Sequence, residues 1–256
     1  MVHRLAADEA PIADHPVALS EGGTRLHDAL CATRQQLEAL ADDTARRLGA
    51  ADAAIFKAHG ELLNDTDLIT LTCQLMVEGH GVAWSWNAAV ERLAAKLSAL
   101  GNAVLAGRAA DLRDVGRRVL ANIDPSLARD TLSALPDHCI LLAADLSPSD
   151  TATLDTAKVI GLATAQGGPT SHTAILARTL GLPALVGGGA ALLDIAEGTS
   201  AIVDGTSGRL YLDPSPAALE SARASIAEQA ATRAREAESR SQPAVTTDGH
   251  AIDIGA

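Results

Sequence analysis

The apolar residues change their spacing once along the chain, near Pro125, and this change constrains the fold more than any other feature. Before it, from about residue 23, leucines and valines recur at the three- and four-residue spacing of amphipathic helices. After it, short apolar runs of strand length alternate with helical segments. The sequence therefore predicts an α+β fold, in which an all-α helical bundle is inserted into a small α/β domain.

The helical part contains five amphipathic segments, separated by breaks rich in glycine, asparagine and aspartate. Short connections between such segments favour packing as a bundle. The predicted helices are residues 24–48, 52–63, 67–78, 82–100 and 103–122.

The α/β part is predicted from apolar runs of strand length and from one short helix start. Ser147, Pro148 and Asp150 have the spacing of a capping box with proline at the first helical position. A last helix without an apolar stripe is predicted to be a connector. The predicted strands are 139–143, 158–163 and 183–186, with a hairpin at 200–203 and 209–212. The expected domains are an α/β domain at 1–22 and 124–215, a helical subdomain at 23–123, a linker helix at 216–242, and the start of a further domain at 243–256.

Composition excludes several classes of protein. The chain has 256 residues and a net charge of −12 with no basic face, which argues against nucleic acid as a partner. No apolar run reaches the roughly 18 residues that span a bilayer, so we expect no membrane insertion and a cytoplasmic protein. Cys31, Cys73 and Cys139 are far apart and are expected to be buried thiols in a reducing compartment. The histidines have no ligand spacing, so no metal site is expected.

The chemistry of the chain is concentrated at Gly167–Arg178, where two glycines and a proline precede a helix with a histidine in its first turn. A helix N-terminus offers unpaired N–H groups and a positive dipole end, which suit a phosphoryl group. The same dipole disfavours an imidazolium and so favours a nucleophilic imidazole at His172. Gly168, Thr170 and Ser171 are the predicted phosphate-stabilising residues. From these residues alone, an exposed histidine after an ordinary glycine turn is an equally good interpretation.

Gly167–Arg178 resembles the phosphohistidine signature of the phosphoenolpyruvate-utilising enzymes. Two segments of the helical part, Ala54–Asp65 and Arg108–Leu120, resemble motifs of one member of that group, Enzyme I of the bacterial sugar phosphotransferase system. Asp145–Ala152 matches the same enzyme, as does the tail around Gly249. The resemblance covers nearly the whole chain, and it also fits a multidomain fusion protein that carries the same half.

This resemblance implies a swivelling phosphohistidine domain, an inserted subdomain that binds the carrier protein HPr, and a linker helix. It implies that His172 is phosphorylated on Nε2 by phosphoenolpyruvate, through a C-terminal domain of the full-length chain, and that it passes the phosphate to a histidine of HPr for sugar uptake. Thr151 matches the threonine that bonds this imidazole. The positions that match the HPr-binding surface are Leu62, Asp65, Asp67, Leu68, Leu97, Leu105 and Arg108.

The sequence also departs from the family pattern. Family members often carry arginine where Pro169 stands, and the family's opening strand is not visible before Val2. No cofactor is expected in this chain, and Mg²⁺ is expected in the C-terminal phosphoenolpyruvate-binding domain, which the sequence does not include. Two alternatives stay open: the swivelling domain of a pyruvate phosphate dikinase or phosphoenolpyruvate synthase, and a non-catalytic module that only docks.

Overall fold

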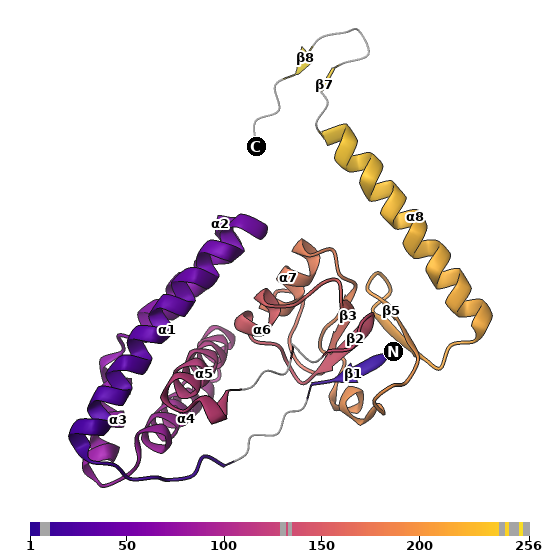
Figure 1. Cartoon of the computed structure of the whole chain (residues 1–256). Helices are drawn as coiled ribbons and strands as arrows, with labels where there is room; N and C mark the ends of the chain where they lie inside the picture. Colours follow the sequence, from indigo (N-terminus) through magenta and orange to yellow (C-terminus); the bar gives the residue numbers. More distant parts are fainter. Residues whose placement is uncertain (6–10, 129–131, 133–134, 241–243, 246–250, 253–256) are drawn as a thin grey trace. The chain divides into compact units, whose positions relative to one another are not determined.

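The computed structural model describes all residues except 6–10, 129–131, 133–134, 241–243, 246–250 and 253–256. The chain divides into two compact units, residues 1–199 with 203–209, and residues 200–202 with 210–256. The first unit contains five long helices and a small parallel sheet, with both kinds of element in one chain as Figure 1 shows. The predicted α+β fold class is therefore confirmed.

Five helices with short turns form the helical part of the first unit. They are α1 (Leu19–Arg47), α2 (Ala50–Leu62), α3 (Thr66–Val77), α4 (Val82–Ala99) and α5 (Ala103–Ile123). Each lies within a few residues of its predicted place. Helix α1 begins five residues earlier than expected, so it includes the glycine pair Gly22-Gly23 and starts without a side-chain cap.

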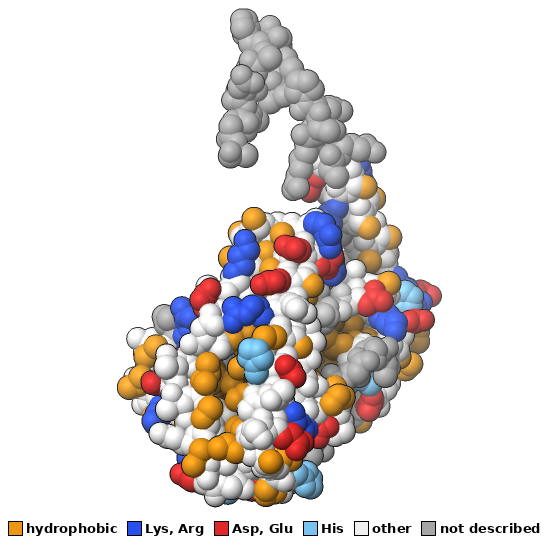
Figure 2. Space-filling model, turned by 60° about the vertical axis from the view of Figure 1, so that its left-hand side comes forward, with side chains coloured by type: hydrophobic (Ala, Val, Ile, Leu, Met, Phe, Trp, Pro, Cys, Tyr) orange, Lys and Arg blue, Asp and Glu red, His pale blue; other side chains and the backbone are white. Residues whose placement is uncertain are grey.

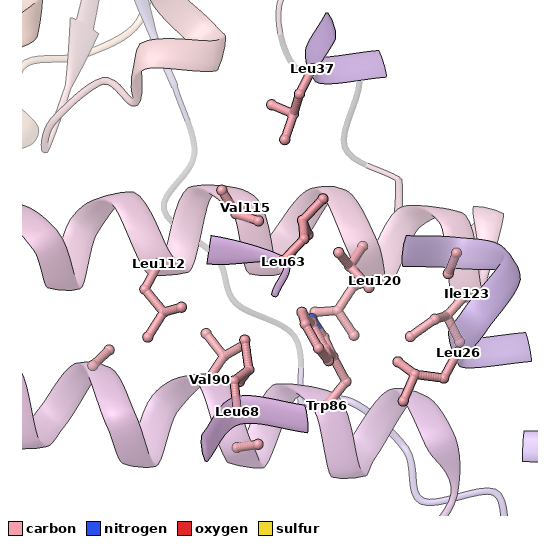
Figure 3. Packing of buried hydrophobic residues seen from close by; sticks show 14 of the residues in the cluster. Leu26, Leu37, Leu63, Leu68, Trp86, Val90, Leu112, Val115, Leu120 and Ile123 are labelled. Atoms are coloured by element: carbon pink, nitrogen blue, oxygen red, sulfur yellow. The ribbon is translucent and has the colours of Figure 1, made fainter. Parts of the chain in front are cut away.

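The core of this helical part is aliphatic around two large aromatic side chains, Trp86 and Phe56, which are 0% and 1% exposed. Figure 3 shows Trp86 among Val90, Leu68 and Leu120. The Trp86 indole N–H donates to the carbonyl of Gly116 on α5 at 3.0 Å. Because that polar atom is satisfied, the whole ring can be buried.

The sheet has four parallel strands in the order β1–β2–β3–β4, which are Val2–Arg4, Cys139–Ala143, Val159–Thr164 and Ala184–Leu185. Strand β1 was not predicted, since three residues are too few to show a strand pattern. The pairing explains why Val2 is only 2% exposed: it lies opposite Ile140 on β2. A parallel edge strand that comes first in the chain must be joined to β2 by a long crossover, and the five helices form it.

Short helices lie between the strands of this sheet and after its last strand. Two 3-10 helices lie at Pro125–Leu127 and Ala190–Asp194, and the α-helices α6 and α7 span Pro148–Ala152 and His172–Thr179. The capping box predicted at the start of α6 is confirmed: Ser147 Oγ accepts from the Asp150 N–H, and the Asp150 carboxylate accepts from the Ser147 N–H. This box fixes where the chain turns into α6 after β2.

The chain ends in strands and one long helix. Strands β5 (Ala201–Asp204) and β6 (Arg209–Leu212) form a two-stranded sheet. In the second unit, α8 (Pro216–Arg240) has exposed side chains at almost every described position, as its lack of an apolar stripe predicts. Strands β7 (Ala244–Val245) and β8 (Ala251–Ile252) pair antiparallel. Within the described residues, no helix combines the length and the apolar character needed to cross a membrane.

The cysteines correct one expectation. All three are free, and Cys139 is buried in β2, where burial raises the pKa of its thiol. Cys31 and Cys73 are exposed, so the prediction of three buried thiols is wrong for these two. Each lies on the outer side of a helix, α1 and α3 respectively, where a small side chain meets solvent without disturbing the core.

The segment that leads from β1 to α1 is fixed to the turn between α3 and α4. The Asp14 carboxylate contacts His80 Nδ1 at 2.7 Å and accepts from the Gly81 N–H at 2.7 Å. These bonds, first that to His80 and then that to Gly81, lower the pKa of Asp14. The His80 ring stacks on Trp84 with ring centroids 4.0 Å apart, which holds it in place.

We expect Gly81→Ala to destabilise the protein, because a Cβ at this position would overlap the backbone of His15. The neighbour is main chain and cannot rotate away, so the segment must shift, at a cost of about 1–3 kcal/mol or more. Gly23 in α1 is the control: a Cβ there meets nothing within 4 Å, and Gly23→Ala should stabilise by about 0.5–1 kcal/mol. Urea unfolding of both variants measures this difference. If the two variants were equally stable, the close packing of Gly81 against the His15 backbone would be contradicted.

Candidate functional site

His172 is the first residue of α7, and it stands on the loop that leaves β3. Ser171 is the N-cap: its Oγ accepts from the Ala174 N–H at 3.3 Å, and its own N–H donates to the Gly168 carbonyl at 2.9 Å. Gly167 has φ +89°, a left-handed conformation that favours glycine. The glycine pair therefore makes the turn, and Ser171 starts the helix, so that the exposed His172 side chain projects from its first turn.

Several backbone donors at this helix start are free. In the described part of the chain, the N–H groups of Thr170, His172 and Thr173 have no hydrogen-bond acceptor. The His172 ring likewise has no hydrogen-bond or ion-pair partner among the described side chains. Free N–H groups at the positive end of a helix dipole favour an anion beside them. The arrangement can therefore hold a phosphoryl group next to an accessible imidazole.

Thr151 lies on α6, which packs against α7, and it is fully buried. Its hydroxyl donates to the Ser147 carbonyl at 2.6 Å. A second threonine, Thr173 on α7, donates to the carbonyl of Leu146, which lies just before α6, at 3.3 Å. No hydrogen bond joins Thr151 to His172 in this conformation, although the Thr151 oxygen keeps lone pairs that can accept a ring N–H. The predicted pairing of Thr151 with the imidazole stays a prediction.

A second glycine loop, which was not predicted from the sequence, supports the His172 loop. The N–H groups of Gly187, Gly188 and Gly189 donate to the carbonyls of Gln166, Thr164 and Ala165 at 3.0, 2.9 and 3.0 Å. A Cβ on Gly187 would lie 3.0 Å from the Gly167 carbonyl, so the two loops approach too closely for a side chain. Three consecutive glycines after a strand were the signal that could have predicted this close approach.

Four of the predicted carrier-binding residues lie together. Leu62, Asp65, Asp67 and Arg108 line an open groove of about 590 Å³, along with Ala58, Glu61, Asn64 and Thr66. The groove is formed by α2, the α2–α3 turn, the start of α3, and α5. Asp65 also caps α3, since its carboxylate accepts from the Leu68 N–H at 3.0 Å.

The other three predicted carrier-binding residues do not line this groove. Leu68 is 0% exposed and is part of the helical core, so it supports the surface from beneath. Leu97 on α4 is partly buried against the same core, and Leu105 on α5 is partly buried. The groove residues proper carry three carboxylates, on Glu61, Asp65 and Asp67, against one guanidinium. This balance favours a basic partner.

The face shown in Figure 2 carries side chains of mixed character. Figure 2 shows acidic, basic and hydrophobic side chains interspersed on the face that it displays, without a single basic patch. Among the residues with described positions, no group of three or more His, Cys, Asp or Glu side chains is placed to hold a metal ion. His59 is 1% exposed and lies edge-on to Phe56, so it is a packed core histidine.

Comparisons with known proteins agree with this geometry. Residues 2–108 match the family model of the N-terminal region of PEP-utilising enzymes, and residues 135–208 match that of their mobile domain. The solution structure of Enzyme I (nEIt) superposes with a TM-score of 0.65 at 31% identity, over 89% of this chain and 93% of that one. The chain belongs to the Enzyme I family of PEP-utilising enzymes.

Longer relatives of the family align over almost all of this chain. The multiphosphoryl transfer protein of Xanthomonas campestris pv. campestris is 70% identical over 100% of the chain, and that of Rhodobacter capsulatus is 42% identical over 99%. The phosphoenolpyruvate-protein phosphotransferase of Bacillus sp. is 33% identical over 98%. The chain spans 31%, 30% and 43% of the lengths of these three proteins.

Proposed function

We propose that this chain is the phosphoryl-transfer half of a phosphoenolpyruvate-protein phosphotransferase. His172 is phosphorylated and passes the phosphoryl group to a histidine of HPr. The observation that carries the proposal is the exposed His172 imidazole at the start of α7, beside N–H groups that have no acceptor in the described chain. A transfer histidine must be reachable by two different partners in turn, and exposure provides this.

In the forward direction, a ring nitrogen of His172, Nε2 by the family resemblance, attacks the phosphorus of phosphoenolpyruvate. The new N–P bond forms as the bond from phosphorus to the enolate oxygen breaks, and the electron pair leaves with that oxygen. In the second step a ring nitrogen of HPr attacks, and the bond to His172 breaks. The free N–H groups of Thr170, His172 and Thr173 can stabilise the equatorial oxygens in both steps. In-line positioning supplies the rest of the catalysis.

The donor side of this reaction belongs to a C-terminal phosphoenolpyruvate-binding domain, where we also place the Mg²⁺ ion and the chemistry that it supplies. The acceptor side belongs to HPr, which docks at the acidic groove of α2, α3 and α5. Residues 243–256 are proposed to lead into the C-terminal domain. We infer a cytoplasmic location and expect no nucleic acid among the partners.

The swivelling domain of a dikinase or synthase is the competing function. The helical part favours the phosphotransferase, because a relative named phosphoenolpyruvate-protein phosphotransferase aligns over 98% of the chain and therefore through these helices. The family model of the N-terminal region of PEP-utilising enzymes also covers α1 to α4 and the first residues of α5. A module that only docks HPr would keep the groove and leave His172 unmodified.

The proposal is tested by mixing this chain with phosphorylated HPr and measuring the intact mass of each protein. We expect the mass of one phosphoryl group to move to this chain, in a form that acid hydrolyses and base preserves, as for a phosphohistidine. Peptide mapping should place the group on the peptide that contains His172. An unmodified chain after prolonged incubation would refute the transfer function.

Docking can be tested separately from transfer. We expect Asp67→Lys to weaken HPr binding about tenfold, because it reverses a charge at an exposed groove position that makes no cap. Leu62→Asp should weaken it also, by placing a charge on the apolar part of the groove. Asp28→Lys on α1 changes the net charge equally outside the groove and should bind normally. Calorimetric titration measures the affinity of each of the three variants for HPr. Equal affinities would show that HPr does not bind at this groove.

A further inference from the structure

Arg178 reaches from the last turn of α7 to the loop that carries His172. Its Nη2 group donates to the Pro169 carbonyl at 3.0 Å. Side chains on a helix lean toward its N-terminus, and arginine is long enough to extend along several residues in that direction. The guanidinium therefore lies beside the start of α7, although its own Cα is near the end of the helix.

The bond from Arg178 holds the backbone at Pro169, close to His172. Proline has no N–H, so at this residue the backbone can be held only through its carbonyl. Pro169 follows the glycine pair and stands three residues before His172. At the other end of the glycine pair, the Gln166 carbonyl accepts from the Gly187 N–H at 3.0 Å. The flexible glycines thus lie between two fixed carbonyls, and Arg178 holds the one nearer to His172.

The charge of Arg178 is not neutralised within the described chain. No Asp or Glu carboxylate among the described residues lies within ion-pair distance of its guanidinium. The side chain is exposed, and the carbonyl that it contacts is neutral. Structural arginines on helix surfaces commonly pair with a carboxylate three or four residues away, as Arg47 does with Asp43. A cation without such a pair beside an anion-binding loop is available to a dianion.

We propose that Arg178 is a positioning residue for phosphoryl transfer at His172. It holds the segment from Pro169 to Ser171 through the Pro169 carbonyl, and it gives the phosphorylated loop a fixed positive charge. Arg178 gains and loses no proton or bond in the reaction. The role of the positive charge rests on the proposed function, whereas the contact of Arg178 with the Pro169 carbonyl is independent of any phosphate.

The kinetic test compares Arg178→Ala and Arg178→Lys with the unaltered protein in rapid-quench measurements of phosphate uptake from phospho-HPr. We expect Arg178→Ala to lower the maximal rate about tenfold or more, since it removes a donor and a charge near the transferred group. The HPr concentration at half-maximal rate should not change, because the docking groove is untouched. Arg178→Lys should recover part of the rate. Arg46→Ala, at an exposed position on α1, should transfer normally.

Two further readouts separate positioning from a general loss of structure. The ³¹P resonance of the phosphohistidine should titrate at higher pH in Arg178→Ala than in the unaltered protein or in Arg178→Lys, because a nearby cation favours the dianion. Without phosphate, the ¹⁵N order parameters of Thr170 and Ser171 should fall in Arg178→Ala from the rigid value of about 0.85 toward about 0.6.

The outcomes distinguish this inference from the proposed function. Unchanged loop order parameters in Arg178→Ala overturn the positioning role whether or not phosphate is transferred. An unchanged transfer rate and ³¹P titration overturn the role of the charge. Failure of the unaltered protein to accept phosphate refutes the proposed function alone, and the order parameters then still decide whether Arg178 holds the loop.

Discussion

Replacing His172 by alanine is expected to abolish phosphate uptake from phospho-HPr. The imidazole is the group at the start of α7 that can form a labile nitrogen–phosphorus bond. The neighbouring hydroxyls of Thr170 and Ser171 could form only oxygen–phosphorus esters, and the Ser171 hydroxyl already accepts from the Ala174 N–H. Because the His172 side chain is exposed and its ring has no hydrogen-bond partner among the described side chains, removing the ring should leave the fold and HPr docking unchanged. Intact-mass measurement after incubation detects the loss directly.

The control for this experiment is a histidine in another exposed helical position. His27 on α1 is exposed and lies outside the groove, so His27→Ala should accept phosphate at the normal rate. HPr affinity of His172→Ala, measured by calorimetry, should equal that of the unaltered chain. Phosphate uptake by His172→Ala at an undiminished level would show that another residue is the acceptor.

Replacing Trp86 by alanine is expected to cost about 3–5 kcal/mol in the free energy of unfolding. Trp86 is 0% exposed and packs where α4 meets α5 (Figure 3). The chain has only two tryptophans, one tyrosine and one phenylalanine, so the surrounding aliphatic side chains offer no large group that could fill the space. The variant would also remove the donor to the Gly116 carbonyl. Urea unfolding followed by circular dichroism measures the loss.

Two variants divide this effect into its parts. Trp86→Phe keeps most of the ring volume but loses the indole N–H, so it should cost clearly less than alanine, with about 1 kcal/mol from the hydrogen bond. Trp84→Ala removes a half-buried tryptophan that stacks on His80, and it should cost about 0.5–1.5 kcal/mol plus a small loss of buried area. If Trp84→Ala were as damaging as Trp86→Ala, the position of Trp86 at the centre of the core would be wrong.

The sequence by itself determined the elements that depend on local rules. The five helices follow from apolar spacing and from breaks such as Asp65, whose carboxylate caps α3. The capping box at Ser147 and Asp150 predicts Pro148 as the first residue of α6, and α6 begins there, because both partners of the box lie within a single turn. The place of His172 in the first turn of α7 follows for the same reason: the glycine turn, the cap and the histidine are contiguous in the chain, so local geometry fixes their relation. Its role as the phosphate acceptor stays a prediction.

Only the tertiary structure decided what depends on residues far apart in the sequence. Strand β1 is too short to recognise until Val2 pairs with Ile140 across the helical insertion. The exposure of Cys31 and Cys73 depends on which helix faces meet neighbours, and a small residue such as cysteine fits either side. The support of the His172 loop by Gly187 is a contact between two turns that separate strands hold together. The hydrogen bond from Arg178 to the Pro169 carbonyl was also not predicted, because it depends on the conformation of one long side chain rather than on the sequence pattern of α7.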